Sequence, residues 1–159
     1  MDTSPLIHHF AHFLIDQGFQ WHVSASFNQD TTYAVGRDKL KVWSAFVDRE
    51  LHGRRYYLRP DESRVFFVAI PEWGASGTNL HYHLLVRVPP VSMSRFQEVA
   101  KSTWSSVVRS GSMYVQQIGN GDEDLKRVVA YDLKDAWRKN NYEHIVFSTE
   151  FSSPGRRIV

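Results

Sequence analysis

Two histidines separated by one residue, His81 and His83, are the side chains whose type and spacing most clearly could support chemistry. Residues i and i+2 of a β-strand point to the same face, with side chains roughly 6–7 Å apart at the base, so both imidazoles could bind one metal ion. A bare pair of this kind is more often exposed or hydrogen-bonded than metal-binding. The opposite face of the strand would be apolar or aromatic, with Leu80, Tyr82, Leu84, Val86 and Val88.

A carboxylate could complete this site. Glu72 ends the preceding expected strand, and a hairpin would bring it beside the histidines, although Glu72 alone would suggest only a solvated strand end. Two imidazoles and a carboxylate suit Mn²⁺ or Mg²⁺ acting as a Lewis acid. A cupin-type site needs a glutamate shortly after the second histidine, and the sequence has Leu84 to Arg87 there. The His-Glu-x-x-His pattern of zinc proteases is also absent.

A second chemical candidate is Tyr131, on a helix expected over residues 123–139. At 100° per residue it lies about 160° from the centre of the apolar face of that helix, and Lys134 projects from nearly the same side. A surface tyrosine beside a lysine is common. The functional alternative is a tyrosine nucleophile assisted by a cation and by a nearby metal-bound phosphate. The apolar face consists of Leu125, Val128, Val129, Leu133, Ala136 and Trp137.

Basic and aromatic residues alternate in the segment GRRYYLR, residues 53–59. Cations along a backbone and aromatic faces for stacking are what single-stranded nucleic acid requires, while a solvated charged surface is the competing interpretation of each cluster. The candidate DNA contacts are Arg54, Arg55, Tyr57 and Arg59 in this segment, and Arg127 and Arg138 on the expected tyrosine helix.

The composition limits the remaining possibilities. The 159 residues contain no cysteine, which excludes disulfides, cysteine-ligated metals and a thiol nucleophile. A net charge of +2 neither requires nor excludes a nucleic-acid partner. The chain has no apolar run near the roughly 20 residues of a membrane span, and its first residues make a poor signal peptide. We therefore expect one domain, residues 1–159, in the cytoplasm and away from membranes, without a fused helicase motor.

Hydrophobic periodicity predicts the elements that must position these side chains. Strands joined by one tight turn are antiparallel neighbours, so the expected fold is α+β, an antiparallel sheet of about five strands with helices packed on it. We expect helices over residues 5–17, 38–51, 94–109 and 123–139, and strands over residues 21–28, 64–72, 80–88, 112–118 and 143–151.

In these motifs the sequence resembles the HUH endonuclease superfamily, specifically its rolling-circle replication initiator (Rep) branch with a single catalytic tyrosine. That family has a histidine–hydrophobic–histidine strand, an acidic third ligand upstream and a later helix with Tyr-x-x-Lys. The corresponding residues here are His81-Tyr82-His83, Glu72 and Tyr131-Asp132-Leu133-Lys134. The segment SASFN resembles the family's first motif more weakly, and the resemblance spans about residues 21–151.

The resemblance implies a function. Tyr131 would nick single-stranded DNA and hold it as a 5′-phosphotyrosine, with Mn²⁺ or Mg²⁺ bound by His81, His83 and Glu72, and with Lys134 orienting the phosphate. The setting would be rolling-circle replication of a plasmid, phage or mobile element in a bacterial or archaeal host. The DNA would lie beside an origin hairpin, and a host helicase would act in trans.

Three alternatives stay open at this point. A transposase or a relaxase of the same superfamily would use the same chemistry, although relaxases usually carry a third histidine that is missing from this motif. The third alternative is a non-catalytic nucleic-acid- or metal-binding module that retains the fold.

Overall fold

The computed structural model describes residues 5–119, 121–138 and 141–151, without the side chains of residues 135, 137 and 138. The candidate DNA contact at Arg138 therefore lies outside the described side chains. Among the described residues, no helix has the length and apolar character needed to cross a membrane. The helices are α1 (Pro5–Asp16), α2 (Tyr33–His52), α3 (Met93–Val107) and α4 (Asp122–Arg138). The strands are β1 (Trp21–Ser26), β2 (Phe66–Glu72), β3 (His81–Arg87), β4 (Ser112–Gln117) and β5 (Val146–Phe147).

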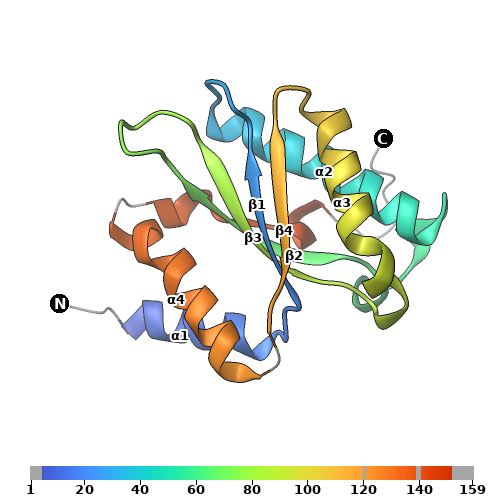
Figure 1. Ribbon diagram of the computed structural model, residues 1–159. Helices are drawn as coiled ribbons and strands as arrows, with labels where there is room; N and C mark the ends of the chain where they lie inside the picture. Colours follow the sequence, from blue (N-terminus) through green and yellow to red (C-terminus); the bar gives the residue numbers. More distant parts are fainter. Residues whose placement is uncertain (1–4, 120, 139–140, 152–159) are drawn as a thin grey trace.

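The predicted fold class is confirmed. The five strands form one sheet in the order β4-β1-β3-β2-β5, and every neighbouring pair is antiparallel. Helices α2 and α3 cover one face of the sheet, while α1 and α4 cover the other (Figure 1). The sheet is therefore the middle layer of three, and alternate side chains of its central strands lie on opposite faces, under different pairs of helices.

Each face of the sheet has its own apolar core. The larger one lies under α2 and α3, and it contains the β3 residues Leu80, Tyr82, Leu84, Val86 and Val88, as the alternation predicted. The smaller one lies under α1 and α4, and it contains Val68, Ile70 and Leu85 together with Leu125, Val129, Leu133 and Ala136 of α4. The histidine face of β3 also contributes to a core, because Leu85 on that face is fully buried in the smaller one.

Helix α2 begins at Tyr33, earlier than the predicted residue 38. Thr32 caps it, because its hydroxyl accepts a hydrogen bond from the Val35 N–H at 3.2 Å. The first turn also contacts the β2–β3 hairpin, since Trp73 Nε1 donates to Tyr33 Oη at 2.6 Å. The tertiary contact explains why the local apolar periodicity placed the start too late.

The last strand is much shorter than the predicted residues 143–151. Only Val146–Phe147 pair with β2, between the 3₁₀ helices Asn141–His144 and Ser148–Phe151. Beyond these two residues, side-chain oxygens accept the backbone hydrogen bonds that a longer strand pair would make. Phe67 N–H donates to Ser148 Oγ at 2.9 Å, and Phe147 N–H donates to Glu150 at 3.0 Å. Such local side-chain bonds compete with strand pairing and turn the chain away.

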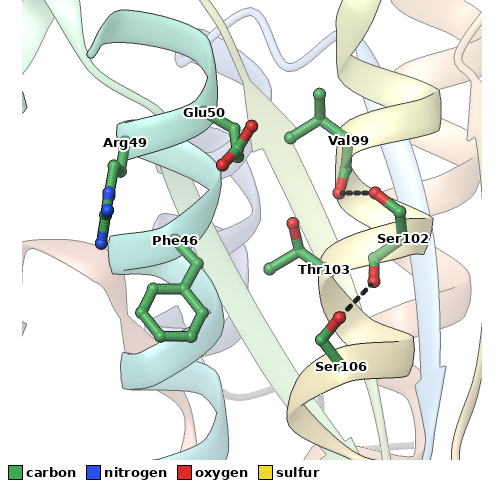
Figure 2. Close-up of a pocket in the computed structure, with 7 residues that line it drawn as sticks. All are labelled: Phe46, Arg49, Glu50, Val99, Ser102, Thr103 and Ser106. Atoms are coloured by element: carbon green, nitrogen blue, oxygen red, sulfur yellow. Dashed lines mark hydrogen bonds between the residues drawn. The ribbon is translucent and has the colours of Figure 1, made fainter. Parts of the chain in front are cut away.

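A shallow groove of about 400 Å³ separates α2 from α3 on the face opposite the histidines. The hydroxyls of Ser102 and Ser106 are bonded to carbonyls of their own helix (Figure 2). Glu50 and Thr103 also line the groove, but among the described residues it holds no cluster of side chains with metal-ligand spacing, so the histidine face is the stronger candidate site.

A close contact joins α2 to β3 at Gly36. A Cβ atom built on Gly36 would lie 2.9 Å from both Cε2 and Oη of Tyr82, whose ring is fully buried. Burial raises the pKa of the Tyr82 phenol, and its hydroxyl has no hydrogen-bond partner among the described residues. The bulky residue between the two histidines is therefore accommodated because the facing helix has a glycine.

We expect Gly36→Ala to lower the free energy of unfolding, although alanine normally stabilises a helix interior by about 1 kcal/mol over glycine. Tyr82→Phe removes an unpaired buried hydroxyl and should leave stability unchanged or raise it by up to about 1 kcal/mol. In the Tyr82→Phe background, Gly36→Ala should cost less because one of the two close contacts is gone. Urea unfolding measures all three variants, and a stabilising Gly36→Ala would contradict the close packing.

Candidate metal centre

The sheet register brings the predicted metal ligands to one place. In the antiparallel pairing of β2 with β3, Glu72 lies directly opposite His81 and Ile70 lies opposite His83. Residues opposite each other in such a pair point to the same face, so the carboxylate and both imidazoles share one side of the sheet. On the other flank of β3, Ser24 of β1 lies opposite His83.

The three side chains converge on a single oxygen. Glu72 Oε2 lies 3.2 Å from His81 Nε2 and is in direct contact with His83 Nε2. One ligand atom from each residue lies within 4.8 Å of the other two. The two imidazole rings are nearly perpendicular at 81°, with centroids 5.1 Å apart. Two nitrogens and an oxygen at this spacing, on a surface open to solvent, match the mixed donor set of a divalent metal site.

The neighbours of the rings favour Nε2 as the ligand atom of both histidines. His81 Nδ1 lies 3.3 Å from the carbonyl oxygen of Asn79, which can only accept, so Nδ1 carries the proton. His83 Nδ1 lies 3.2 Å from Ser24 Oγ, and a proton on that nitrogen can be donated to the hydroxyl. Outer partners of this kind fix the tautomer and the orientation of metal-binding imidazoles.

The charge state of Glu72 also suits a ligand. Partial burial raises its pKa, but hydrogen bonds and positive charge from His83 and His81 outweigh that effect, and the pKa is lowered overall. The carboxyl group is therefore ionised across the neutral pH range and available to a cation.

Tyr131 lies at the edge of this cluster. Its ring is 61% exposed, off the apolar stripe of α4 as predicted, and it approaches His83 edge-on with centroids 6.1 Å apart at 81°. Lys134 is exposed three residues later on the same helix. The structure thus brings together a tyrosine, two histidines and a glutamate that come from two strands and a helix.

Two further residues of the cluster were missed from the sequence. His22 of β1 stacks against His83 with centroids 5.5 Å apart at 10°, and its Nε2 lies 3.0 Å from both carboxylate oxygens of Asp132. His22, His83 and Asp132 form a second group with metal-ligand spacing. The alternation of β1 placed His22 on its polar face beside Ser24, but only the pairing with β3 and the docking of α4 connects it to the site.

The candidate DNA contacts lie in two distant regions. Arg127 is on the same face of α4 as Tyr131, one turn earlier, where it pairs with Asp124 at 3.2 Å. The segment 53–59 follows the far end of α2, about 30 Å from the end that touches Trp73 beside Glu72. Within it Arg54, Arg55 and Arg59 are exposed and Tyr57 is half-buried, while Tyr56 is buried beneath the guanidinium of Arg64.

A polar hollow of about 330 Å³ adjoins the histidines at the ends of β1 and β3. It is lined by Ser26, Asn28, Asn79, Leu80 and His81. Open space next to the candidate ligands is what a substrate group would need in order to reach a bound metal ion.

Comparison of the chain with protein-family models, with curated proteins and with solved structures found no significant match.

We expect the purified protein to bind one Mn²⁺ ion at this cluster. His81→Ala and Glu72→Gln should each lower the affinity by about tenfold or more, because each removes a ligand atom or its charge. The exposed His8→Ala variant on α1 is the matched control and should bind normally. Isothermal titration calorimetry measures the affinities, and unchanged binding by both site variants would contradict the assignment.

Proposed function

We propose that the protein is a metal-dependent, single-tyrosine endonuclease and strand transferase of the HUH type that acts on single-stranded DNA. The observation that supports this most directly is the position of Tyr131. A mostly exposed phenol on a helix stands beside His83, whose Nε2 shares Glu72 Oε2 with His81. A surface tyrosine without a role would have no reason to lie at a three-residue ligand set.

The donor set fits a divalent cation, since two imidazole Nε2 atoms and an ionised carboxylate face one point. Mn²⁺ or Mg²⁺ held by His81, His83 and Glu72 would supply Lewis-acid polarisation of a phosphate oxygen. Ser24 and the Asn79 carbonyl would keep the two imidazoles oriented by bonding their Nδ1 atoms.

Tyr131 would act as the nucleophile. Its Oη forms a bond to the phosphorus of the scissile phosphodiester while the bond from phosphorus to O3′ breaks. The phenol loses its proton, the leaving O3′ gains one, and the products are a 5′-phosphotyrosine and a free 3′-hydroxyl. The reverse attack by a 3′-hydroxyl rejoins DNA, so the bond energy is conserved and no ATP is required.

Two cations flank the nucleophile on the outer face of α4. Lys134 follows Tyr131 by three residues and Arg127 precedes it by four, so all three project from one side of the helix. Lys134 would stabilise the charge that develops on the phosphate. Arg127 would hold the backbone of the bound strand, exchanging its ion pair with Asp124 for a phosphate.

The proposal extends to the biological role that the motif resemblance implies, initiation of rolling-circle replication of a plasmid, phage or mobile element. The DNA would be single-stranded beside an origin hairpin and would be unwound by a host helicase in trans. Transposition would use the same nicking and rejoining steps, and the sequence of the preferred nicking site would distinguish the two roles.

We expect Tyr131→Phe to abolish covalent attachment of DNA while leaving stability and Mn²⁺ affinity unchanged, because it removes one exposed oxygen. Lys134→Ala should slow attachment without abolishing it, since charge stabilisation lowers a barrier but does not form the bond. The assay is incubation with random-sequence single-stranded DNA and Mn²⁺, followed by denaturing electrophoresis and sequencing of the attached strand.

Tyr114→Phe, which removes the hydroxyl of another mostly exposed tyrosine, is the matched control for this experiment and should attach DNA at the parental rate. An adduct that persists in Tyr131→Phe would place the nucleophile elsewhere. If neither the parent nor any variant forms an adduct with any strand, the protein is instead a binding module that retains the fold.

DNA binding should depend on strand length. We expect Arg127→Ala to weaken binding of short and long single strands alike, because Arg127 lies beside the nucleophile. Arg54→Ala and Arg55→Ala should weaken only strands long enough to span α2, about 30 Å. Each lost phosphate contact should reduce the slope of log K against log salt by about 0.7. Fluorescence anisotropy over a salt series tests this, and unchanged long-strand affinity would make residues 53–59 an ordinary solvated surface.

A further inference from the structure

The carboxylate next to the proposed nucleophile is buried. Asp132 follows Tyr131 on α4, its side chain is 0% exposed, and both of its oxygens accept from His22 Nε2 at 3.0 Å. Removing either partner of a buried pair leaves the other uncompensated, so this contact strongly favours one placement of the helix.

His22 joins that carboxylate to the metal ligands. It lies on β1, next to the strand that carries the histidine pair, and its ring stacks on His83 at 5.5 Å. His83 in turn meets the edge of the Tyr131 ring at 6.1 Å. His83 is therefore connected to Tyr131 in two ways. It contacts the tyrosine ring directly, and it also stacks on His22, which bonds the residue next to Tyr131 in the chain.

An apolar cluster also joins α4 to the sheet. Leu125, Val129, Leu133 and Ala136 pack with Val68, Ile70 and Leu85, and such surfaces tolerate small rotations more readily than a directional pair does. Successive helical residues are 100° apart, so directing Asp132 into the sheet directs Tyr131 to the side that faces His83. The pair sets the rotation of the helix.

We propose that His22 and Asp132 are positioning residues that hold Tyr131 at the distance from the metal at which it can attack a bound phosphate. The inference rests on the proposed function for its chemical consequence. Its structural content, the placement of Tyr131 relative to the metal, can be measured without any DNA reaction.

The alternative is that His22 and Asp132 are themselves metal ligands with His83, since their spacing allows it. The contacts favour positioning. His83 Nε2 already faces Glu72 in the first ligand set, and its Nδ1 lies 3.2 Å from Ser24 Oγ, so a second ion would have to displace Ser24. The Asp132 side chain is also 0% exposed, whereas that of Glu72 is 23% exposed and accessible to an entering cation.

The test compares variants that break the pair with variants that preserve it. His22→Phe keeps a ring against His83 but has no N–H, and Asp132→Leu has no acceptor. Asp132→Asn keeps an oxygen that can accept from His22, and His22→Gln keeps an N–H donor. His9→Phe, an exposed histidine on α1, is the matched control.

Three quantities are measured for each variant: Mn²⁺ affinity by calorimetry, the single-turnover rate of adduct formation at saturating DNA, and the ¹⁹F signal of fluorotyrosine at position 131. Bound Mn²⁺ broadens that signal according to its distance, and Tyr131→Phe assigns it. We expect His22→Phe and Asp132→Leu to lower the rate about 10- to 100-fold and to change the broadening, with Mn²⁺ affinity within about threefold of the parent. Asp132→Asn, His22→Gln and His9→Phe should stay close to the parent in all three.

Each other outcome is informative. A loss of Mn²⁺ affinity like that of His81→Ala would make the pair ligands and overturn the proposal, as would an unchanged rate and unchanged broadening. If the pair-breaking variants do not fold, the proposal is overturned when Asp132→Asn and His22→Gln fold and bind Mn²⁺ yet lose the rate. A parent that binds Mn²⁺ but forms no adduct refutes the nicking function alone, and the ¹⁹F broadening still tests the positioning.

Discussion

The pairing of β2 with β3 is the constraint on which the candidate site depends, because it sets Glu72 directly opposite His81. A shift of one residue would turn the whole strand over and send the histidines into the larger core. The register is fixed by burial on both faces, since the β3 residues Tyr82, Leu84 and Val86 belong to one core and Leu85 to the other. The packing of the two cores therefore also holds the three ligand atoms together.

The tyrosine depends on a different kind of interaction. Its helix lies on the smaller core through apolar contacts, and the contact of the buried Asp132 with His22 is the directional interaction that we propose sets the rotation of that helix. A buried pair is weak evidence for extra stability, but it is well suited to specifying one arrangement among several similar ones. Here that arrangement places an exposed phenol against a candidate metal ligand while its neighbour in the chain is fully enclosed.

The two faces of the sheet differ in what they hold. Helices α2 and α3 cover the larger core, which is closed by contacts such as Gly36 against Tyr82 and Trp43 Nε1 donating to the Ala100 carbonyl at 3.0 Å. The other face combines a smaller core with the polar ends of β1, β2 and β3. The candidate ligands are held rigidly by paired strands, and the hollow beside His81 would leave room for a substrate of the proposed reaction.

The sequence by itself determined those features that depend on local periodicity. The alternation over residues 80–88 placed both histidines on one face, the helical spacing placed Tyr131 off the apolar stripe, and the order of elements indicated an antiparallel α+β fold. Tertiary structure decided the rest. Asp132 is 110 residues from His22 in the chain, so no local pattern could pair them. The early start of α2, the short β5 and the distance of residues 53–59 from the site likewise follow from contacts between remote segments, because side-chain bonds and packing outweigh local propensity where they meet.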